Sequence, residues 1–163
     1  MNIKIISDST CDLSAELIQQ YDISIVPLTV VKDGIAYSDG VTITPDEIFA
    51  HVAAGGSLCS TTALNADEYS AHFTKYADKY DGVLHINIGS GFSSCYQNAC
   101  IAADDFSNVR VVDSQNLSTG QGLVVLKACE LAQTCTDLDQ LQQQLKDGVL
   151  ESYDFIPETK ASA

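Results

Sequence analysis

A short polar stretch of this sequence gathers small and hydroxyl-bearing residues directly after an apolar run. It contains Ser90, Gly91, Ser93 and Ser94, and a segment that can form a helix follows it. A strand, a turn and a helix in this order place free N–H groups and hydroxyls at a helix N-terminus, which carries roughly half a positive elementary charge. The stretch is therefore a candidate seat for a phosphate or a carboxylate.

Similar polar turns occur at Ser7-Asp8-Ser9-Thr10, at Ser60-Thr61-Thr62 and after Val112. If each turn follows a parallel strand, all of them meet at one edge of a sheet, where ligands usually bind. Hydroxyls of Thr61 and Thr62 would then join those of the serine-rich stretch around an anion. Each charge-assisted hydrogen bond contributes about 1.5–3 kcal/mol. The alternative is that these hydroxyls only cap helices and turns.

The enzymatic alternative is a serine-dependent hydrolase or acyltransferase that uses Ser90 or Ser93. Ile88, however, stands two residues before Ser90, where a nucleophile elbow has glycine. The histidines that could serve as the base are expected within helices or a strand; they are His51, His72 and His85. The stretch also lacks the lysine of a P-loop and the third glycine of a dinucleotide fingerprint. We expect no cofactor, and no set of metal ligands stands out.

The bulk composition narrows the function classes. A chain of 163 residues fits one domain, and its net charge of −14 argues against a nucleic-acid partner. The six cysteines include no C-x-x-C pair, which favours structural thiols. No apolar run approaches the roughly 20 residues that span a bilayer. We therefore expect a cytoplasmic protein without an integral membrane segment.

Strands and helices alternate along the chain, which predicts an α/β fold with three layers, α/β/α, and a mostly parallel sheet. The expected strands cover 3–6, 23–31, 35–37, 83–88 and 109–112. The expected helices begin after Ser14, Thr44, Asn65, Phe92, Ser118 and Thr136. We expect inward-facing apolar side chains on the second and fifth of these helices, including Phe49, Val52 and Leu123.

Ordered blocks of residues over most of the chain resemble the DegV family. They are Ile6-Ser7-Asp8-Ser9-Thr10-Cys11-Asp12-Leu13, Val26-Pro27-Leu28 with Tyr37-Ser38-Asp39-Gly40, Thr61-Thr62-Ala63-Leu64-Asn65, the stretch 88–99, and Val112-Asp113-Ser114 followed by Ser118-x-Gly120-x-Gly122. The order of the blocks makes the resemblance far more specific than any one of them.

The resemblance implies a bacterial fatty-acid-binding protein that presents the acyl carboxylate of a long-chain fatty acid to a separate fatty acid kinase for phospholipid synthesis. The kinase would supply ATP and metal ions. By position, Thr61 and Ser93 would hold the carboxylate. Their neighbours Thr62, Ser90, Gly91 and Ser94 are expected to line the same site.

Some positions depart from the family pattern. Thr62 replaces a serine, which keeps a hydroxyl, and Ala63-Leu64-Asn65 replaces Gln-Pro-Ser. Ser94-Cys95 replaces Gly-Thr, which adds bulk near the expected site.

By the same resemblance, residues 1–163 correspond to the N-terminal lobe of the family, with 152–163 leading toward a second lobe. In the family that second lobe carries a Gly-Gly-Arg motif and a later histidine, which complete the carboxylate site. An acyl tunnel that is only half built leaves apolar surface exposed to water. Such surface favours self-association.

Overall fold

The structure, a computed structural model, describes residues 1–154. Its centre is a four-stranded parallel sheet with the strand order β2-β1-β6-β7. The strands are β1 (Ile3–Asp8), β2 (Ser24–Val26), β6 (Gly82–Asn87) and β7 (Val109–Asp113). The expected α/β class with a mostly parallel sheet is confirmed. Residues 155–163, most of the expected connection to a second lobe, lie outside the described residues.

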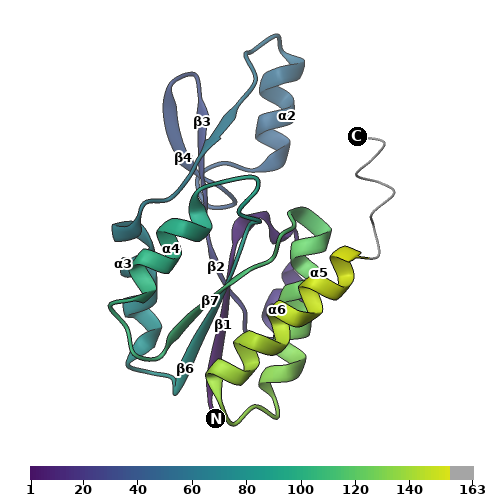
Figure 1. The fold of residues 1–163 in the computed structure, drawn as a ribbon. Coiled ribbons are helices and arrows are strands. Elements are labelled where there is room, and N and C mark those ends of the chain that lie inside the picture. Colours follow the sequence, from purple (N-terminus) through teal and green to yellow (C-terminus); the bar gives the residue numbers. More distant parts are fainter. Residues whose placement is uncertain (155–163) are drawn as a thin grey trace.

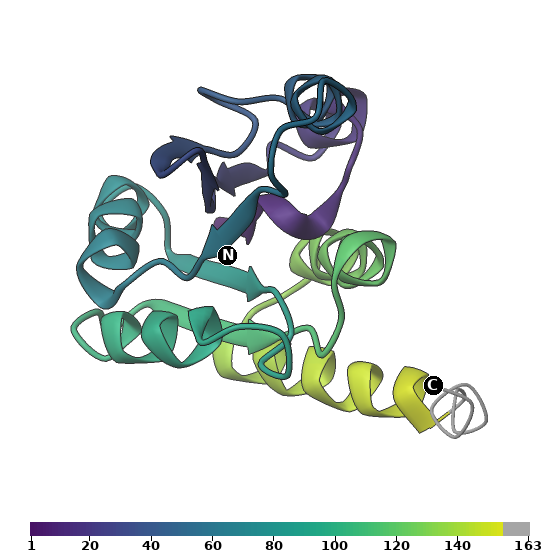
Figure 2. The ribbon, with the colours of Figure 1, turned by 90° about the horizontal axis from the view of Figure 1, so that it is seen from above.

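Helices cover both faces of this sheet, as Figures 1 and 2 show. One face packs against α3 (Ala66–Ala77) and α4 (Cys95–Ala103). The other packs against α1 (Ala15–Gln20), α5 (Ser118–Ala132) and α6 (Leu138–Asp154). Neighbouring strand residues point to opposite faces, so Ile6 joins the first core and Ile5 the second. The expected three layers are therefore present.

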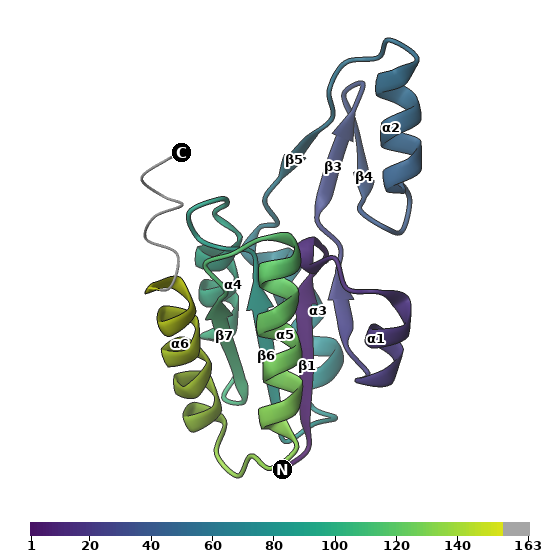
Figure 3. The same cartoon turned by 90° about the vertical axis from the view of Figure 1, so that its right-hand side faces the viewer.

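A second, smaller sheet projects beyond the carboxyl end of the first (Figures 1 and 3). Its antiparallel strands lie in the order β4-β3-β5, and α2 accompanies them. The elements are β3 (Thr29–Lys32), β4 (Ile35–Ser38), α2 (Pro45–Ala53) and β5 (Ser60–Thr62). We call residues 29–62 the arm.

The strand expected over 23–31 is two strands, one in each sheet. Pro27 lies between β2 and β3, where its fixed φ and missing N–H interrupt a ladder. Asp33 and Gly34 form the turn between β3 and β4. Both residues have positive φ, 51° and 76°, as a two-residue hairpin turn of the primed type requires.

The start of α2 follows the prediction, but its burial does not. The helix begins after Thr44 as expected: Thr44 and Glu47 form a capping box, with Pro45 at the first helical position. Phe49 is nevertheless 71% exposed and Val52 37% exposed, and α2 has no buried residue. Because α2 lies in the arm, away from the large sheet, it has no core to enter.

On α5 the expected inward position of Leu123 is wrong, since its side chain is 65% exposed, whereas Leu131 packs against the core. The buried face instead carries small residues such as Gly122 and Ala128. A Cβ added to Gly122 would lie 2.6 Å from the carbonyl oxygen of Cys11, so α5 approaches the turn after β1 too closely there for a large side chain. At α6, Asp137 rather than Thr136 caps the helix, accepting from the Asp139 N–H at 2.9 Å.

No helix within residues 1–154 combines the length and the apolar character needed to cross a membrane. All six cysteines are free, which confirms the expectation of unpaired thiols.

The thiols differ in accessibility, so we expect alkylation to follow burial. Burial raises the pKa of Cys129 to about 11 and also raises the pKa of Cys11, so both stay protonated at pH 8. Half-buried Cys59 and Cys135 should react with iodoacetamide first, and Cys11 and Cys129 only after unfolding. Peptide mass spectrometry after timed quenching measures this order. Equal labelling of Cys129 and Cys59 in the folded protein would contradict it.

Candidate functional site

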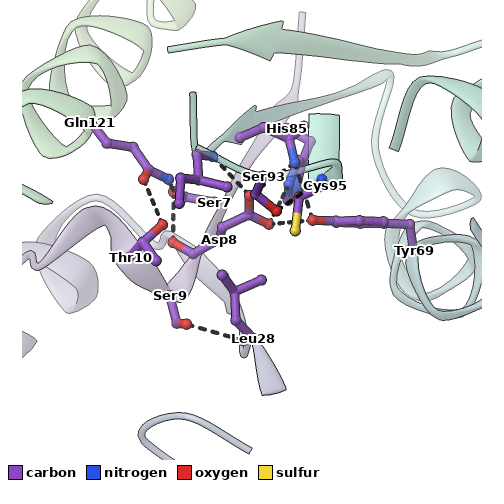
Figure 4. A network of polar contacts seen from close by, with 12 residues as sticks. Ser7, Asp8, Ser9, Thr10, Leu28, Tyr69, His85, Ser93, Cys95 and Gln121 are labelled. Atoms are coloured by element: carbon purple, nitrogen blue, oxygen red, sulfur yellow. Dashed lines mark hydrogen bonds and ion pairs between the residues drawn. The ribbon is translucent and has the colours of Figure 1, made fainter. Parts of the chain in front are cut away.

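Asp8, at the carboxyl end of β1, is fully buried, with 0% of its surface exposed. Its Oδ1 accepts from the Tyr69 hydroxyl at 2.8 Å and from His85 Nε2 at 3.1 Å. Its Oδ2 accepts from Asn87 Nδ2 and from the Ile88 N–H, both at 2.9 Å. Figure 4 shows this cluster. Partners on both oxygens are what allow a carboxylate to be buried.

The pleat of the sheet brings these groups together. Ile6 pairs with His85, and since side chains alternate along a strand, Asp8, His85 and Asn87 share the face that packs on α3. The Tyr69 ring of α3 meets the His85 ring edge-on, with 5.3 Å between centroids. Burial, and next the Asp8 charge, raises the pKa of Tyr69, so its hydroxyl stays protonated and donates to Asp8.

The cluster lies at the point where the chain connections diverge. After β1 the chain passes to α1 on one face of the sheet, whereas after β6 it passes to α4 on the other face. β1 and β6 are neighbours, so their carboxyl ends form the topological switch point of the sheet. In open α/β sheets this is the usual place for a ligand.

The loop 88–94, which follows β6, is held from both sides by aspartates. Asp8 of β1 accepts from the Ile88 N–H, and Asp113 of β7 accepts from the Ser90 N–H at 3.0 Å. Asp113 also accepts from the Gln115 N–H at 2.9 Å. Asp113 thus organises its own turn through the Gln115 N–H, whereas Asp8 accepts from the backbone of the neighbouring loop after β6.

The root of this loop is also closely packed. The Gly89 N–H donates to the carbonyl of Asn116 at 2.8 Å. A Cβ on Gly89 would lie 2.8 Å from the backbone nitrogen of Asn116, whereas a Cβ on Gly91 would meet nothing within 4 Å. The loop therefore has a fixed root and an open tip.

The tip keeps hydrogen-bond donors for a ligand. Among the described residues, the N–H groups of Gly91, Ser93 and Ser94 donate to no protein group. The Ser93 hydroxyl accepts from the Cys95 N–H at 3.1 Å, and its own proton has no protein acceptor. Ser93 is half-buried, while Ser90, Gly91 and Ser94 are exposed. Not all of the loop's N–H groups are available to an anion. The Ile88 N–H donates to Asp8 and the Ser90 N–H donates to Asp113.

Thr61 and Thr62 belong to a different sheet from the one expected. Both are exposed in β5 of the arm, where Thr61 pairs with Val30. The chain returns from β5 to the large domain beside α4, because Asn98 Nδ2 donates to the carbonyl of Leu64 at 2.8 Å. The arm and the loop 88–94 thus lie at the same end of the large sheet (Figures 1 and 3).

The DegV family model matches residues 2–150 of the chain. This chain belongs to the DegV family. It is 34% identical over 145 residues to a DegV domain-containing protein of Clostridium perfringens, an alignment that covers 88% of this chain and 52% of the relative. The chain spans about half the length of the curated DegV relatives that it matches.

Solved DegV structures share the fold. A DegV family protein from Thermus thermophilus, described as binding fatty acid, matches with a TM-score of 0.81 and 33% identity. That match covers 90% of this chain and 53% of the Thermus chain. A stearic-acid-binding protein from Eubacterium ventriosum matches with a TM-score of 0.77 and 30% identity, over 88% of this chain and 52% of the other.

The histidines of this DegV chain lie in the kinds of element that were expected. His51 is in α2, 3.5 Å from Asp33, and His72 is in α3. His85 is buried in β6 and bonded to Asp8, while its Nδ1 has no partner. Within the part of the chain that is described, no histidine hydrogen-bonds Ser90 or Ser93, as a serine nucleophile and its base would.

Two surface hollows of about 350 Å³ lie elsewhere on this DegV chain. One is bordered by α4, β7 and α6, with Tyr96 and Arg110 in its wall. The other is at the amino end of β1, beside Tyr21 and Cys129. Neither includes Thr61 or Ser93.

Proposed function

We propose that this chain binds a long-chain fatty acid by its carboxylate, at the edge formed by the loop 88–94 and β5. The observation that carries the proposal is the match to the Thermus DegV protein, at 33% identity and a TM-score of 0.81. The stearic-acid-binding relative supports it independently. We take residues 1–163 as the N-terminal lobe of a two-lobed binding protein, which fits the half-length coverage of both relatives.

The carboxylate would be held by neutral donors. The Ser93 hydroxyl has a proton to donate. Near the start of α4, the N–H groups of Gly91 and Ser94 donate to no described protein group. The positive end of the helix dipole favours an anion there. Thr61 would add a hydroxyl from the arm. No lysine or arginine lies in the loop 88–94, so within this loop the charge would be met by hydrogen bonds and the helix dipole.

In this proposal the chain is a carrier without catalytic residues, and a fatty acid kinase phosphorylates the carboxylate it presents. The exposed tip of the loop supports such a handover, because Ser90 and Gly91 are open to a partner enzyme. The kinase would bring ATP and metal ions.

Removing either hydroxyl should weaken carboxylate binding. We expect Ser93→Ala and Thr61→Val each to lower the affinity for octanoate about tenfold, because each loses one hydrogen bond to a charged group, worth about 1.5 kcal/mol or more. Octanoate is soluble, and titration of the ¹⁵N-labelled chain followed by NMR measures affinities as weak as millimolar. The amides of 91–95 should shift in the wild-type chain.

Octanamide, which has the same chain length but no charge, is the matched control ligand and should move these amides little. Ser57→Ala, an exposed serine of the arm outside β5, is the control variant. Wild-type affinity in both Ser93→Ala and Thr61→Val would reject the site. Labelling of Ser90 or Ser93 by a fluorophosphonate would instead favour the hydrolase.

A further inference from the structure

Three residues form a hydrogen-bonded ring where the arm meets the end of β1. The Ser9 hydroxyl donates to Asp39 Oδ2 at 2.7 Å and accepts from the Leu28 N–H at 3.1 Å. The Asp39 N–H donates to the carbonyl of Leu28 at 2.9 Å, which closes the ring. Figure 4 shows Ser9 beside Leu28, next to the Asp8 cluster.

The ring gathers both ends of one hairpin. Leu28 directly precedes β3, and Asp39 directly follows β4. The same hairpin carries β5, since Val30 of β3 pairs with Thr61. Ser9 is therefore connected to Thr61 through a single sheet, and a change in the tilt of that sheet moves Thr61.

The two parts of the candidate site, the loop 88–94 and the arm, are thus held by two consecutive residues at the end of β1. Asp8 holds the root of the loop 88–94 through the Ile88 N–H, and Ser9 holds the arm. Because one peptide unit joins them, the end of β1 is a common reference for both parts.

The ring also restricts rotation of the arm, which the two covalent connections to the large domain do not. The chain passes between large domain and arm at two places, before β3 and after β5. The second crossing is fixed by the buried side chain of Leu64 and by the bond from Asn98 to its carbonyl. Two points of attachment leave rotation about the line between them, and Asp39, held by Ser9, provides a third.

We propose that Ser9 and Asp39 are positioning residues of the carboxylate site, which set the separation of Thr61 and Ser93 without touching the ligand. The role in binding rests on the proposed function, whereas the restraint on the arm is independent of it. The ligand in this proposal is an alkyl carboxylate. Its carboxylate would accept hydrogen bonds from the loop 88–94 and from the arm at the same time.

The restraint is tested first, in the chain without ligand. Residual dipolar couplings report the orientation of the arm relative to the large sheet, and Ser9→Ala and Asp39→Ala should each average the couplings of the arm. Thr10→Val is the matched control. It removes the next hydroxyl of the same turn, which donates to Gln121 Oε1 of α5 at 2.6 Å and not to the arm.

Binding is tested by a double-mutant cycle. Ser9→Ala should lower the affinity for octanoate by up to about tenfold, the full effect of losing the Thr61 hydrogen bond. In a Thr61→Val background the same change should cost little more, because Ser9 acts through Thr61. Ser9→Thr, which keeps the hydroxyl, should restore binding. A purely structural role would give additive losses.

The outcomes separate the two ideas. Unchanged arm couplings in both Ser9→Ala and Asp39→Ala overturn the restraint. Averaged couplings with wild-type octanoate affinity, or additive losses in the cycle, overturn the positioning role and leave the carboxylate site standing. If the wild-type chain shows no octanoate-specific shift, the proposed function fails and the positioning role fails with it, whatever the couplings show about the arm.

Discussion

Replacing Asp8 by alanine is expected to lower the free energy of unfolding by about 3–5 kcal/mol, the range for breaking a buried charged network. The Tyr69 hydroxyl and the Ile88 N–H would lose their acceptor inside the protein, and Asn87 Nδ2 would keep only the Tyr69 hydroxyl. Each unsatisfied buried group adds its own desolvation cost. Urea unfolding followed by circular dichroism measures the change.

Asp139→Ala is the matched control for this variant. Asp139 also lies in an ion pair, 2.6 Å from Arg110 Nε, but it is exposed, so its loss should change stability little. If Asp8→Ala is as stable as Asp139→Ala, the buried cluster does not hold the carboxyl end of the sheet together. Asp8→Asn should fall between the two, because an amide keeps one acceptor oxygen while its NH₂ group faces donors.

The second large effect concerns the length of the bound lipid. We expect this chain to bind stearate at least on the order of 100-fold more weakly than the Thermus DegV protein, of whose length the match covers 53%. Each methylene left in water forgoes about 0.8 kcal/mol, so four of them already account for that factor. Isothermal titration of stearate below its aggregation limit, into both proteins, measures the difference.

Octanoate is the control for this comparison. If the carboxylate is bound mainly by the loop 88–94 and β5, the two proteins should differ much less for the short acid than for stearate. Equal stearate affinities would contradict the two-lobed arrangement. A difference that is the same for both acids would place the missing contacts at the carboxylate instead of along the acyl chain.

The large sheet could be predicted because its signals are local. Short apolar runs and the caps at Ser14 and Asn65 specify strands and helix starts within a few residues. The separate sheet of the arm could not be predicted, because the residues of 23–31 are equally suited to one strand or two. Only the position of Pro27 relative to its neighbours in space decides that the chain changes sheets there.

The candidate site shows the same division. The loop after β6 and the turn after β1 were both found from their small and hydroxyl-bearing residues. The buried cluster around Asp8 was missed, although a signal was present: His85 and Asn87 interrupt an apolar strand at every second position. Polar residues at every second position of a buried strand indicate that one face of the strand meets polar partners. Here the partner is Tyr69 of α3.

The contrast between the fixed root and the open tip of the loop 88–94 has a kinetic consequence. We expect the amide proton of Ile88, bonded to an aspartate inside the core, to exchange with solvent far more slowly than those of Gly91 and Ser94. Substitutions at the tip should therefore change the groups that the loop presents to solvent without loosening the domain that carries it.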